Sequence, residues 1–491
     1  MRRHANRAGD HHDSRRDVRR DIRKMPGAIR VAPVDDVGHV VVDEDPVLAW
    51  VHAGEHTATA FTGAVRHAVA VRPTRPDIVQ RRLPAPVTQL HAIGAVQGRE
   101  RPVLAQFHDH TIVAADPVDV VVGDAVWDAL RVPCAGPSAG ISAAAGAWIG
   151  LLSYDLAGTI EHLPAPVPDP GGPPLAAIGR YDTVAVIDRH GSCVVLSRAG
   201  AGAAQDLVDR LMADQPPIVP CPPVDVAPLP SLTAARYLAS VERIRELIRA
   251  GDCYQVNLTK RLTAPWSGSG LAFAMQIWQT AGEASHLAYI GLPEGTVVSA
   301  SPERLVVVRD GVATAEPIKG TAPLGRWSEL ATSVKDRAEH VMIVDLLRND
   351  LGRVARAGAV TVPRLFAHLS TPYVEHMVSE IRAELRSDVT ATDVLRAVFP
   401  SGSVTGTPKV RSMEVIRDLE PVSRGPAFGS VVVVGTDGAI ESSVTIRTAW
   451  IAGGEVRYWC GGAVVWDSNA DAELAEAGAK AVPFLRTIGA L

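Results

Sequence analysis

Seven prolines crowd the stretch between residues 215 and 232, QPPIVPCPPVDVAPLPSL. Proline has no backbone amide to donate and a fixed φ, so neither a helix interior nor a central strand holds such a run. The stretch is therefore predicted to be an extended connector. It divides the 491-residue chain, which is long enough to bury a substantial core, into two parts with different patterning.

The part before the connector, residues 28–214, is predicted to be a β-rich subdomain. Short Val-, Ile- and Ala-rich segments such as VAVRP and DTVAVID alternate there with Gly, Pro and Asp, which is typical of strands joined by turns. Residues 1–27 are instead basic, rich in histidine and nearly free of apolar side chains. We predict a disordered tail or a mis-assigned start before Met25, with a nucleic-acid-binding arm as the alternative.

The part after the connector, residues 233–491, alternates helix and strand patterns. Apolar side chains share one face over residues 234–250, and Gly251 follows as a stop signal, so a helix is predicted there. Further strands are expected near 297–308, 428–435, 442–451 and 456–465, and further helices near 334–348, 390–398, 408–418 and 470–488.

The segment YQVNLTKRL has the period of a strand. Its apolar positions are Tyr254, Val256 and Leu258, and they alternate with the polar positions Gln255, Asn257 and Thr259. Because successive side chains of a strand point to opposite faces, the pattern predicts one buried face and one polar face.

Composition narrows the class of protein. Apolar residues make up 47% of the chain and charged residues 21%, as in a soluble globular protein. No run approaches the roughly 18 apolar residues that a membrane span needs, and a net charge of -5 disfavours a general nucleic-acid binder. The five cysteines lie far apart without metal-ligand spacing, so a reduced, cytoplasmic protein is expected.

A glutamate and a lysine frame the segment SPERLVVVRDGVATAEPIKGTAP. Glu303 and Lys319 lie at the two ends of a predicted β-hairpin, which would bring them face to face. A lysine in apolar surroundings has a lowered pKa, so its amine is free to act as a nucleophile. A neighbouring carboxylic acid can protonate a leaving hydroxyl. A surface salt bridge across the hairpin is the alternative.

Two acidic segments, SVKDRAEHVMIVDLL and SNADAELAEAGAKAV, are predicted to be helices. Glu473, Glu476 and Lys480 share one face of the second helix. Glu339 lies in the first turns of the first helix, beside an apolar stripe that begins at Val341. Carboxylates from two helices that meet over a pocket would suit Mg²⁺, which takes few ligands from protein. The alternative is that these acids only balance the helix dipoles.

A glycine-rich loop, PSGSVTGTPKVRSMEVI, precedes a predicted helix that Pro408 opens. Its free backbone amides suit an anion. The loop lacks the GK[ST] ending of a phosphate loop, and Pro408 removes an amide, so nucleotide binding is disfavoured. A carboxylate would fit the same amides, with Arg447 of the predicted strand SVTIRTAWI as a bidentate clamp. A buried structural role for Arg447 is the alternative.

Taken together, these segments resemble the chorismate-utilising enzymes, which include anthranilate synthase component I, aminodeoxychorismate synthase component I, isochorismate synthase and salicylate synthase. The matching motifs run in the family's order from about residue 232 to 491: YQVNLTKRL, SASPERL, PIKGT, RAEHVMIVDLLRNDLGRV, GSVTGTPKVRSMEVI, TIRT and EAGAK. The part before the connector is matched chiefly by GAWIGLLSYDLAGTIEHLP.

The resemblance implies an α+β fold, a large two-sheet antiparallel β-sandwich flanked by helices as in anthranilate synthase component I, with chorismate and Mg²⁺ in a cleft. It implies Glu339 and Glu476 as Mg²⁺ ligands, with Glu473 beside them. Glu303 becomes the general acid at the departing 4-hydroxyl, and His376 falls where anthranilate synthases carry a histidine near the ring. The substrate-binding residues that it implies are Arg447, Gly461, Gly462, Ser403, Gly406, Lys480 and Gln255.

Two positions separate the branches of the family. Members that use water as the nucleophile place a lysine where this chain has Gln255, because water needs a general base. Isochorismate and salicylate synthesis are therefore disfavoured. Anthranilate synthases typically carry PIAGT where this chain has PIKGT, and the lysine is similar to that of aminodeoxychorismate synthases. We therefore interpret Lys319 as a covalent nucleophile.

The resemblance also implies partners. The chain lacks an obvious GxCxG nucleophile motif, so ammonia is expected from a separate glutamine amidotransferase subunit. A separate aminodeoxychorismate lyase would then release pyruvate to form p-aminobenzoate on the folate route. Anthranilate synthase component I is one alternative activity. A non-catalytic carboxylate-binding or scaffold relative is the other.

Three positions depart from the family pattern and leave room for a specialised-metabolism variant. Ala463 replaces the third glycine of a glycine-rich turn, and its methyl group is expected to crowd the substrate carboxylate. Ala427 stands where relatives often have an aromatic residue, and Val432 where many have glycine.

Overall fold

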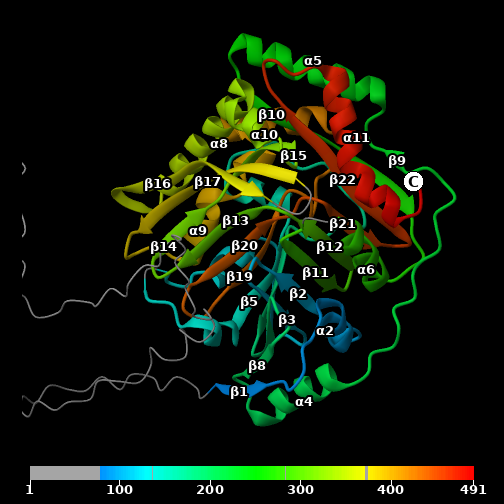
Figure 1. Ribbon diagram of the computed structural model, residues 1–491, viewed down its shortest axis with the longest axis vertical. Helices are drawn as coiled ribbons and strands as arrows, with labels where there is room; N and C mark the ends of the chain where they lie inside the picture. The colour runs from blue at the N-terminus through cyan, green and yellow to red at the C-terminus, as the bar shows by residue number, and fades with distance from the viewer. Residues whose placement is uncertain (1–77, 135, 282–283, 371–373) are drawn as a thin grey trace, which may run out of the picture. The chain divides into compact units, whose positions relative to one another are not determined.

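The computed structural model describes residues 78–491 except 135, 282–283 and 371–373. The predicted tail, and residues 28–77 of the predicted β-rich subdomain, lie outside the described residues. Two large antiparallel sheets with helices packed around them make up the described part (Figure 1). This is the α+β architecture that the resemblance implied.

The first sheet has 12 strands. In spatial order they are β1 (Val79–Arg82), β8 (Cys193–Ser197), β7 (Thr183–Asp188), β3 (His110–Ala114), β2 (Val103–Gln106), β11 (His286–Leu292), β12 (Gly295–Ser301), β21 (Thr448–Ala452), β22 (Glu455–Val464), β10 (Gln255–Pro265) and β18 (Gly406–Thr407), and β9 (Leu229–Pro230) also pairs with β10.

The second sheet has 10 strands. They are β15 (Ile318–Pro323), β17 (Val374–Leu385), β14 (Val312–Ala315), β13 (Arg304–Arg309), β20 (Ile440–Val444), β19 (Ser430–Val434), β5 (Ala147–Leu152), β6 (Ala176–Tyr181) and β4 (Asp119–Val122), and β16 (Ala355–Ser370) also pairs with β17.

The α-helices within the described ranges connect and cover these strands. They are α2 (Gln89–Val96), α3 (Val126–Ala129), α4 (Ala201–Met212), α5 (Ala234–Ala250), α6 (Gly270–Thr280), α7 (Trp327–Thr332), α8 (Val334–Gly352), α9 (Ala391–Val398), α10 (Lys409–Leu419) and α11 (Ala470–Thr487). Four short 3₁₀ helices join them: η1 (Gly123–Ala125), η2 (Gly140–Ala144), η3 (Tyr154–Thr159) and η4 (Gly402–Val404). None of these helices is long and apolar enough to cross a membrane.

Strands from both sides of the proline-rich stretch share both sheets. In the first sheet β2 pairs with β11, and in the second β5 pairs with β19. Residues 215–228 hold neither helix nor strand. The prolines therefore separate two stretches of sequence without separating the sheets, and the division into subdomains stays a prediction.

The main hydrophobic core lies between the sheets. Ile112 of β3 and Val297 of β12 belong to the same buried cluster as Ile149 of β5 and Val432 of β19. A second cluster covers the outer face of the first sheet, where Phe273 of α6 packs with other buried apolar residues of that sheet and its helices. A third joins α5, β10, α10 and α11. Apolar packing therefore holds in place both helices that carry the predicted acidic site residues: α8 in the main core and α11 in the third cluster.

Local sequence signals explain most helix boundaries. The predicted helix over 234–250 is α5: the Thr233 side chain accepts from the Arg236 amide at its start, and Gly251 closes it at φ 84°. Pro408 precedes α10, as predicted. The prediction of a single strand over 442–451 is wrong, because two strands cover this range. β20 ends at Val444 and β21 begins at Thr448. Arg447, in the gap, has φ 49°, which a regular strand does not allow.

The prediction that YQVNLTKRL has one buried face and one polar face is also wrong. The polar positions Gln255, Asn257 and Thr259 are buried, whereas Tyr254 is exposed. β10 lies between β22 and β18 in the first sheet, and the burial of both alternating sets of its side chains, Val256 and Leu258 as well as the polar ones, shows that both of its faces are covered. Among these polar residues, Thr259 has a protein partner: its amide and hydroxyl both donate to Glu420 Oε1, at 2.8 and 2.9 Å.

Candidate functional site

Lys319 occupies a bulge in β15. The pairing of β15 with β17 shifts register between Ile318 and Thr321, so Lys319 and Gly320 fall where the ladder is interrupted. Gly320 has φ 80°, and a Cβ added there would lie 2.7 Å from Leu330 Cδ1. Only glycine adopts this conformation and fits this space at little cost. A bulge re-aims side chains, which explains why the motif places glycine directly after the lysine.

Lys319 and Glu303 influence each other across the hairpin, as predicted. Burial lowers the pKa of Lys319, and the charge of Lys480 lowers it further, against the opposing charge of Glu303. Burial raises the pKa of Glu303, which a hydrogen bond from Ser403 and the charge of Lys319 partly offset. The Ser403 hydroxyl donates to Glu303 Oε1 at 2.5 Å. Both shifts favour the neutral amine and the neutral acid, the forms needed for nucleophilic attack and for proton donation.

Glutamates of α8 and α11 face this pair. Burial raises the pKa of Glu339, Lys319 opposes that shift, and the negative charge of Glu473 adds to it. Burial also raises the pKa of Glu473, with Glu476 adding to it. Figure 1 shows β15 between α8 and α11. We call Glu303, Lys319, Glu339 and Glu473 the charged cluster, because each member shifts the pKa of another.

The acidic part of the cluster offers oxygen donors of the kind that Mg²⁺ takes. Glu473 is buried, and its Oε2 has no hydrogen-bond partner, although Ser468 donates to its Oε1 at 2.6 Å. A Cβ at Gly462 would lie 3.2 Å from that Oε2 and 3.4 Å from Glu476 Oε1, so the glycine leaves space beside both carboxylates. An orphaned carboxylate oxygen next to like charges fits a hard cation.

The predicted magnesium ligands are nevertheless spread out. Within the described residues, no group of three or more His, Cys, Asp or Glu side chains lies close enough together to hold a metal ion. Glu339 forms a loose ion pair with Lys335 at 3.8 Å, and Glu476 pairs with Lys480 at 2.7 Å. Because Mg²⁺ takes only one or two carboxylates and completes its shell with water and substrate, this donor set fits it without closing around it.

The predicted substrate-binding residues fall into two groups. Ser403, in η4, contacts Glu303 directly. Gln255 is buried, and neither its Oε1 nor its Nε2 has a hydrogen-bond partner. Gly406 of β18 lies so close to β10 that a Cβ there would be 2.1 Å from the Gln255 carbonyl oxygen. An unpaired buried amide is costly, and a bound polar ligand would relieve that cost.

The second group belongs to the segment after β20. Lys480 donates to the Gly461 carbonyl at 3.0 Å, which ties α11 to β22. Gly461 and Gly462 pair with Thr259 and Leu258 of β10. Arg447 lies in the gap between β20 and β21 and donates to the Ala281 carbonyl at 3.2 Å.

His376 lies on β17, directly across the ladder from Thr321 of β15. Its Nδ1 is 2.9 Å from the Thr321 hydroxyl. Thr321 is two residues from Lys319, so His376 is connected to the strand that carries the lysine.

Three residues at or near the charged cluster, Lys335, Ser468 and His340, are not among those predicted from the sequence. Lys335 lowers the pKa of both Glu339 and Glu473, and its only sequence signal is its place one turn before Glu339. Ser468, before α11, holds Glu473. The apolar stripe predicted on α8 is wrong at its first position, because Val341 is 47% exposed whereas His340 is fully buried. The only sequence signal of His340 is its place next to Glu339, a predicted site residue.

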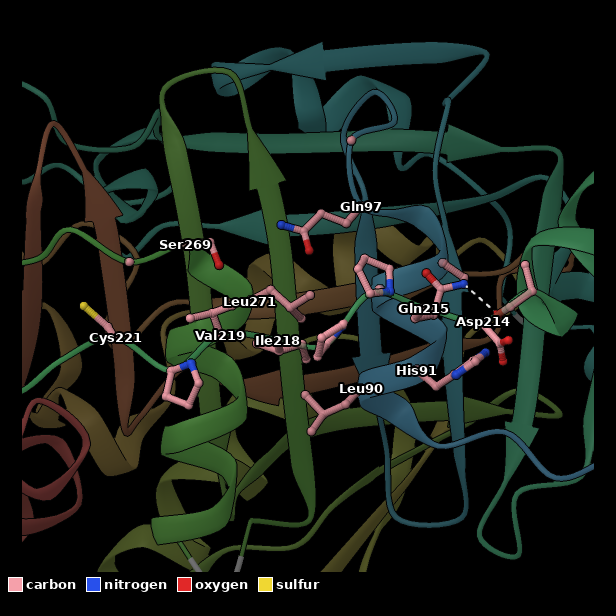
Figure 2. A pocket seen from close by; sticks show the side chains of 18 of the residues that line it. Leu90, His91, Gln97, Asp214, Gln215, Ile218, Val219, Cys221, Ser269 and Leu271 are labelled. Atoms are coloured by element: carbon pink, nitrogen blue, oxygen red, sulfur yellow. Dashed lines mark hydrogen bonds between the residues drawn. The ribbon is translucent and has the colours of Figure 1, made fainter.

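A separate cavity of about 1080 Å³ lies beneath the proline-rich stretch. Figure 2 shows its wall formed by Leu90 and His91 of α2, Ile218 and Val219 of the stretch, and Leu271 of α6. None of the predicted site residues lines it. It is therefore distinct from the charged cluster.

Comparison with known proteins places this chain in a family. The model of the family described as chorismate binding enzyme matches residues 96–486. The chain belongs to the chorismate-binding enzymes. The matched range contains every member of the charged cluster, so family membership and site geometry concern the same part of the chain.

The similar relatives include aminodeoxychorismate synthases and anthranilate synthases. Aminodeoxychorismate synthase component 1 of Klebsiella aerogenes is 39% identical over 339 residues, covering 67% of this chain and 74% of the relative. The protein of that name from Escherichia coli K12 is 37% identical with the same coverage. Anthranilate synthase component 1 of Streptomyces coelicolor is 34% identical, covering 69% of this chain and 72% of its own. This chorismate-binding enzyme is thus a homologue of aminodeoxychorismate synthase component 1.

Solved structures confirm the fold. Anthranilate synthase component I from Streptococcus pneumoniae superposes with a TM-score of 0.66 at 23% identity, over 89% of this chain and 96% of that one. The menaquinone-specific isochorismate synthase MenF of Escherichia coli also gives 0.66, at 19% identity over 84% and 95%. The family fold therefore carries more than one chemistry, and the residues of the site must decide between them.

Proposed function

We propose that this chorismate-binding enzyme aminates chorismate to 4-amino-4-deoxychorismate, with ammonia as the nitrogen source. One observation carries the proposal: Lys319 lies where burial lowers the pKa of its amine and faces Glu303, where burial raises the pKa of the carboxyl group. The pair therefore supplies a nucleophile and an acid together. The relatives named aminodeoxychorismate synthase component 1 support this branch.

The proposed reaction has two substitutions. Neutral Lys319 attacks ring carbon 2 while the ring double bonds shift, and the bond from carbon 4 to its hydroxyl breaks. Glu303 gives its proton to that hydroxyl, which leaves as water. Ammonia then bonds to carbon 4, the bond from carbon 2 to Lys319 breaks, and the surplus proton returns to Glu303. Chorismate and ammonia thus give the aminated product and water, with enolpyruvate retained. Because the substitution is divided into two steps, each charge that develops is stabilised or neutralised by a group that is already in place.

The other residues bind and orient. Arg447 and the strand at Gly461 and Gly462 are proposed to bind the enolpyruvyl carboxylate, and His376 to lie near the ring. Mg²⁺, when bound at Glu339, Glu473 and Glu476, would neutralise and anchor the ring carboxylate. Gln255, which has no acid–base function, does not activate water.

The name component 1 of the relatives supports a second subunit. We propose a glutamine amidotransferase as the ammonia source, and a separate lyase that converts the product to p-aminobenzoate on the folate route. Anthranilate synthesis is the second candidate, because relatives of that name reach 34% identity.

The deciding experiment identifies the product. Purified chain is incubated with chorismate, Mg²⁺ and ammonium, with and without an added aminodeoxychorismate lyase, and the products are separated by liquid chromatography with mass detection. We expect 4-amino-4-deoxychorismate, and p-aminobenzoate only when lyase is present. Anthranilate without lyase would show the second candidate to be correct, and isochorismate would show that water is the nucleophile. Glutamine should replace ammonium only when an amidotransferase subunit is added.

A further inference from the structure

Two serines of the glycine-rich loop form a chain of hydroxyl groups that ends on Glu303. The Ser403 hydroxyl donates to Glu303 Oε1 at 2.5 Å, and the hydroxyls of Ser401 and Ser403 lie 2.9 Å apart. The Ser401 hydroxyl oxygen also accepts from the Ser403 amide at 3.3 Å. All three side chains are buried. The chain therefore runs from Ser401 through Ser403 to the proposed acid.

The hydrogen bonds give this chain a direction. A hydroxyl group has one proton to donate. Because Ser403 donates its proton to Glu303 Oε1, the proton in the 2.9 Å contact belongs to Ser401. In the reverse direction Glu303 Oε1 would donate to Ser403, and Ser403 to Ser401. Among the described residues Ser403 is the only acceptor for the Ser401 hydroxyl, so the reverse direction would leave a buried hydroxyl proton unpaired, which is unfavourable.

This direction decides which oxygen of Glu303 carries the proton of the acid. Oε1 already accepts the proton of Ser403. The proton of neutral Glu303 therefore lies on Oε2, the oxygen that the serine chain leaves free. General acid catalysis needs the proton on an oxygen that can reach the leaving group.

From this arrangement we propose that Ser401 is a positioning residue for Glu303: by donating to Ser403, it directs the Ser403 proton to Oε1 and keeps the proton of the acid on Oε2. The inference rests on the proposed function of Glu303. The main chain at Ser401 has other support, because its carbonyl accepts from the Val404 amide at 3.2 Å and from the Thr405 hydroxyl at 3.0 Å. Removal of the Ser401 hydroxyl should therefore leave the loop in place.

The charged groups that act on Glu303 are Lys319 of β15 and Lys480 of α11, and both favour its carboxylate form. In the segments beside the serines, Arg424 and Lys409 are each paired with a carboxylate. All four cations are retained when a serine is replaced. A change in the pH profile of a serine variant therefore reports the hydroxyl chain.

The test is a double-mutant cycle read from the pH profile of kcat/KM for chorismate, at a fixed concentration of free ammonia. Ser403→Ala should move the alkaline limb to higher pH by about 1 unit, because the carboxylate loses a hydrogen bond. Ser401→Ala should move it the same way by about 0.3 unit, since one hydrogen bond strengthens the next by about 10–30%. In the Ser403→Ala background, Ser401→Ala should move the limb no further, because Ser401 acts through Ser403.

The maximal rate tests the position of the acid proton. Ser401→Ala should lower kcat at least about twofold, because the proton is then no longer confined to Oε2. The KM for chorismate should stay unchanged. A kcat equal to that of the wild type would overturn the proposal.

Ser197 provides the matched control. Its hydroxyl lies 2.8 Å from that of Thr183 and accepts from the Ala199 amide at 3.1 Å, so it has the same two kinds of contact as Ser401. It lies on β8, near the opposite edge of the first sheet from β18. Ser197→Ala should lower the melting temperature about as much as Ser401→Ala while leaving the pH profile and kcat unchanged.

Two results of the cycle would overturn the proposal. If Ser401→Ala lowers the melting temperature but leaves the alkaline limb in place, Ser401 only caps η4. If the shifts of Ser401→Ala and Ser403→Ala add in the double variant, Ser401 does not act through Ser403.

Two further variants keep the test decisive. If Ser401→Ala does not fold, Ser401→Cys, which keeps a side chain of similar size but is a weak donor, takes its place with the same expected shift. Glu303→Gln is measured alongside. If Glu303→Gln retains its rate, the proposed function fails; if it loses its rate but the limb stays in place in the position 401 variant, only the positioning inference fails.

Discussion

Two groups of buried and half-buried charges in this molecule differ in how completely they are paired. Arg424, which is 2% exposed, forms an ion pair with Glu420 at 2.7 Å and donates to the carbonyls of Val404 and Asn257. Asp155 accepts from Arg417, from the hydroxyl of Ser423 and from the amide of Gly425. We call this the Arg424 network. Both charges have all the partners that their geometry needs.

The charged cluster is the opposite case. Glu473 keeps an orphaned oxygen, and Gln255, one of the predicted substrate-binding residues, has both amide atoms unpaired. Burial shifts the pKa of Lys319 and of the glutamates toward their neutral forms. A fully paired network adds rigidity, whereas an unpaired one costs stability unless a ligand completes it. The first group thus has the complete pairing of a structural network, whereas the second has the unpaired groups expected of a site that binds a ligand.

The largest effect is expected from the removal of the proposed nucleophile. Lys319→Ala should lower the rate of chorismate amination by at least about 1000-fold, a loss typical of removing a principal catalytic group. Its melting temperature should not fall, because the variant no longer places in the protein interior an amine whose protonation burial opposes. Steady-state kinetics and thermal unfolding measure the two effects. Lys319→Arg is the control: it keeps a charge that cannot be lost, so a variant with wild-type rate would show that Lys319 does not act as a nucleophile.

A loss of stability, in contrast to the loss of rate expected for Lys319→Ala, is expected from a change in the Arg424 network. Arg424→Met should lower the free energy of unfolding by about 3–5 kcal/mol, because it leaves the charge of Glu420 buried without its partner. Denaturant titration measures this change. Arg243→Ala, at an exposed pair with Glu246, should cost less than about 0.5 kcal/mol. If both variants cost the same, the network is not structural.

A smaller effect is expected at the proposed magnesium site. Glu473→Gln should raise the Mg²⁺ concentration for half-maximal rate by about 10- to 100-fold. Because burial raises the pKa of Glu473, the folded state binds more protons than the unfolded state above the ordinary carboxyl pKa, and this carboxyl destabilises the fold as pH rises. The variant should therefore unfold at a higher temperature than wild type at neutral pH. Asp471→Asn, at an exposed position of α11, should change neither value.

The smallest expected effect is a change in the pH profile. The rate needs neutral Lys319 and protonated Glu303, so it should fall below the lowered pKa of Lys319 and above the raised pKa of Glu303. Ser403 donates to the Glu303 carboxylate and so lowers the pKa of Glu303. Ser403→Ala should therefore move the alkaline limb of the rate profile to higher pH. A limb that stays fixed or moves to lower pH would contradict Glu303 as the acid.

Much of the site was predictable because its motifs are local. Glu303 and Lys319 were predicted to meet from the length of a hairpin, and they do influence each other. The bond from Ser403 to Glu303 joins residues 100 positions apart in sequence, and no pattern in one sequence predicts it. The burial of His340 was missed because Val341 fits an apolar stripe equally well on paper, and only the packing of β17 against α8 decides between them.

The sequence by itself determined the boundaries of α5 and α10, the motifs of the site and the position of each candidate residue along the chain. Caps, glycines and proline act through hydrogen bonds and steric limits that reach only a few residues. The tertiary structure decided that the polar face of β10 is buried, that Arg447 lies outside a strand and that Lys319 occupies a bulge against α8. Burial, and the pKa shifts that follow from it, depend on side chains that distant segments bring together, so they exist only once the sheets have formed.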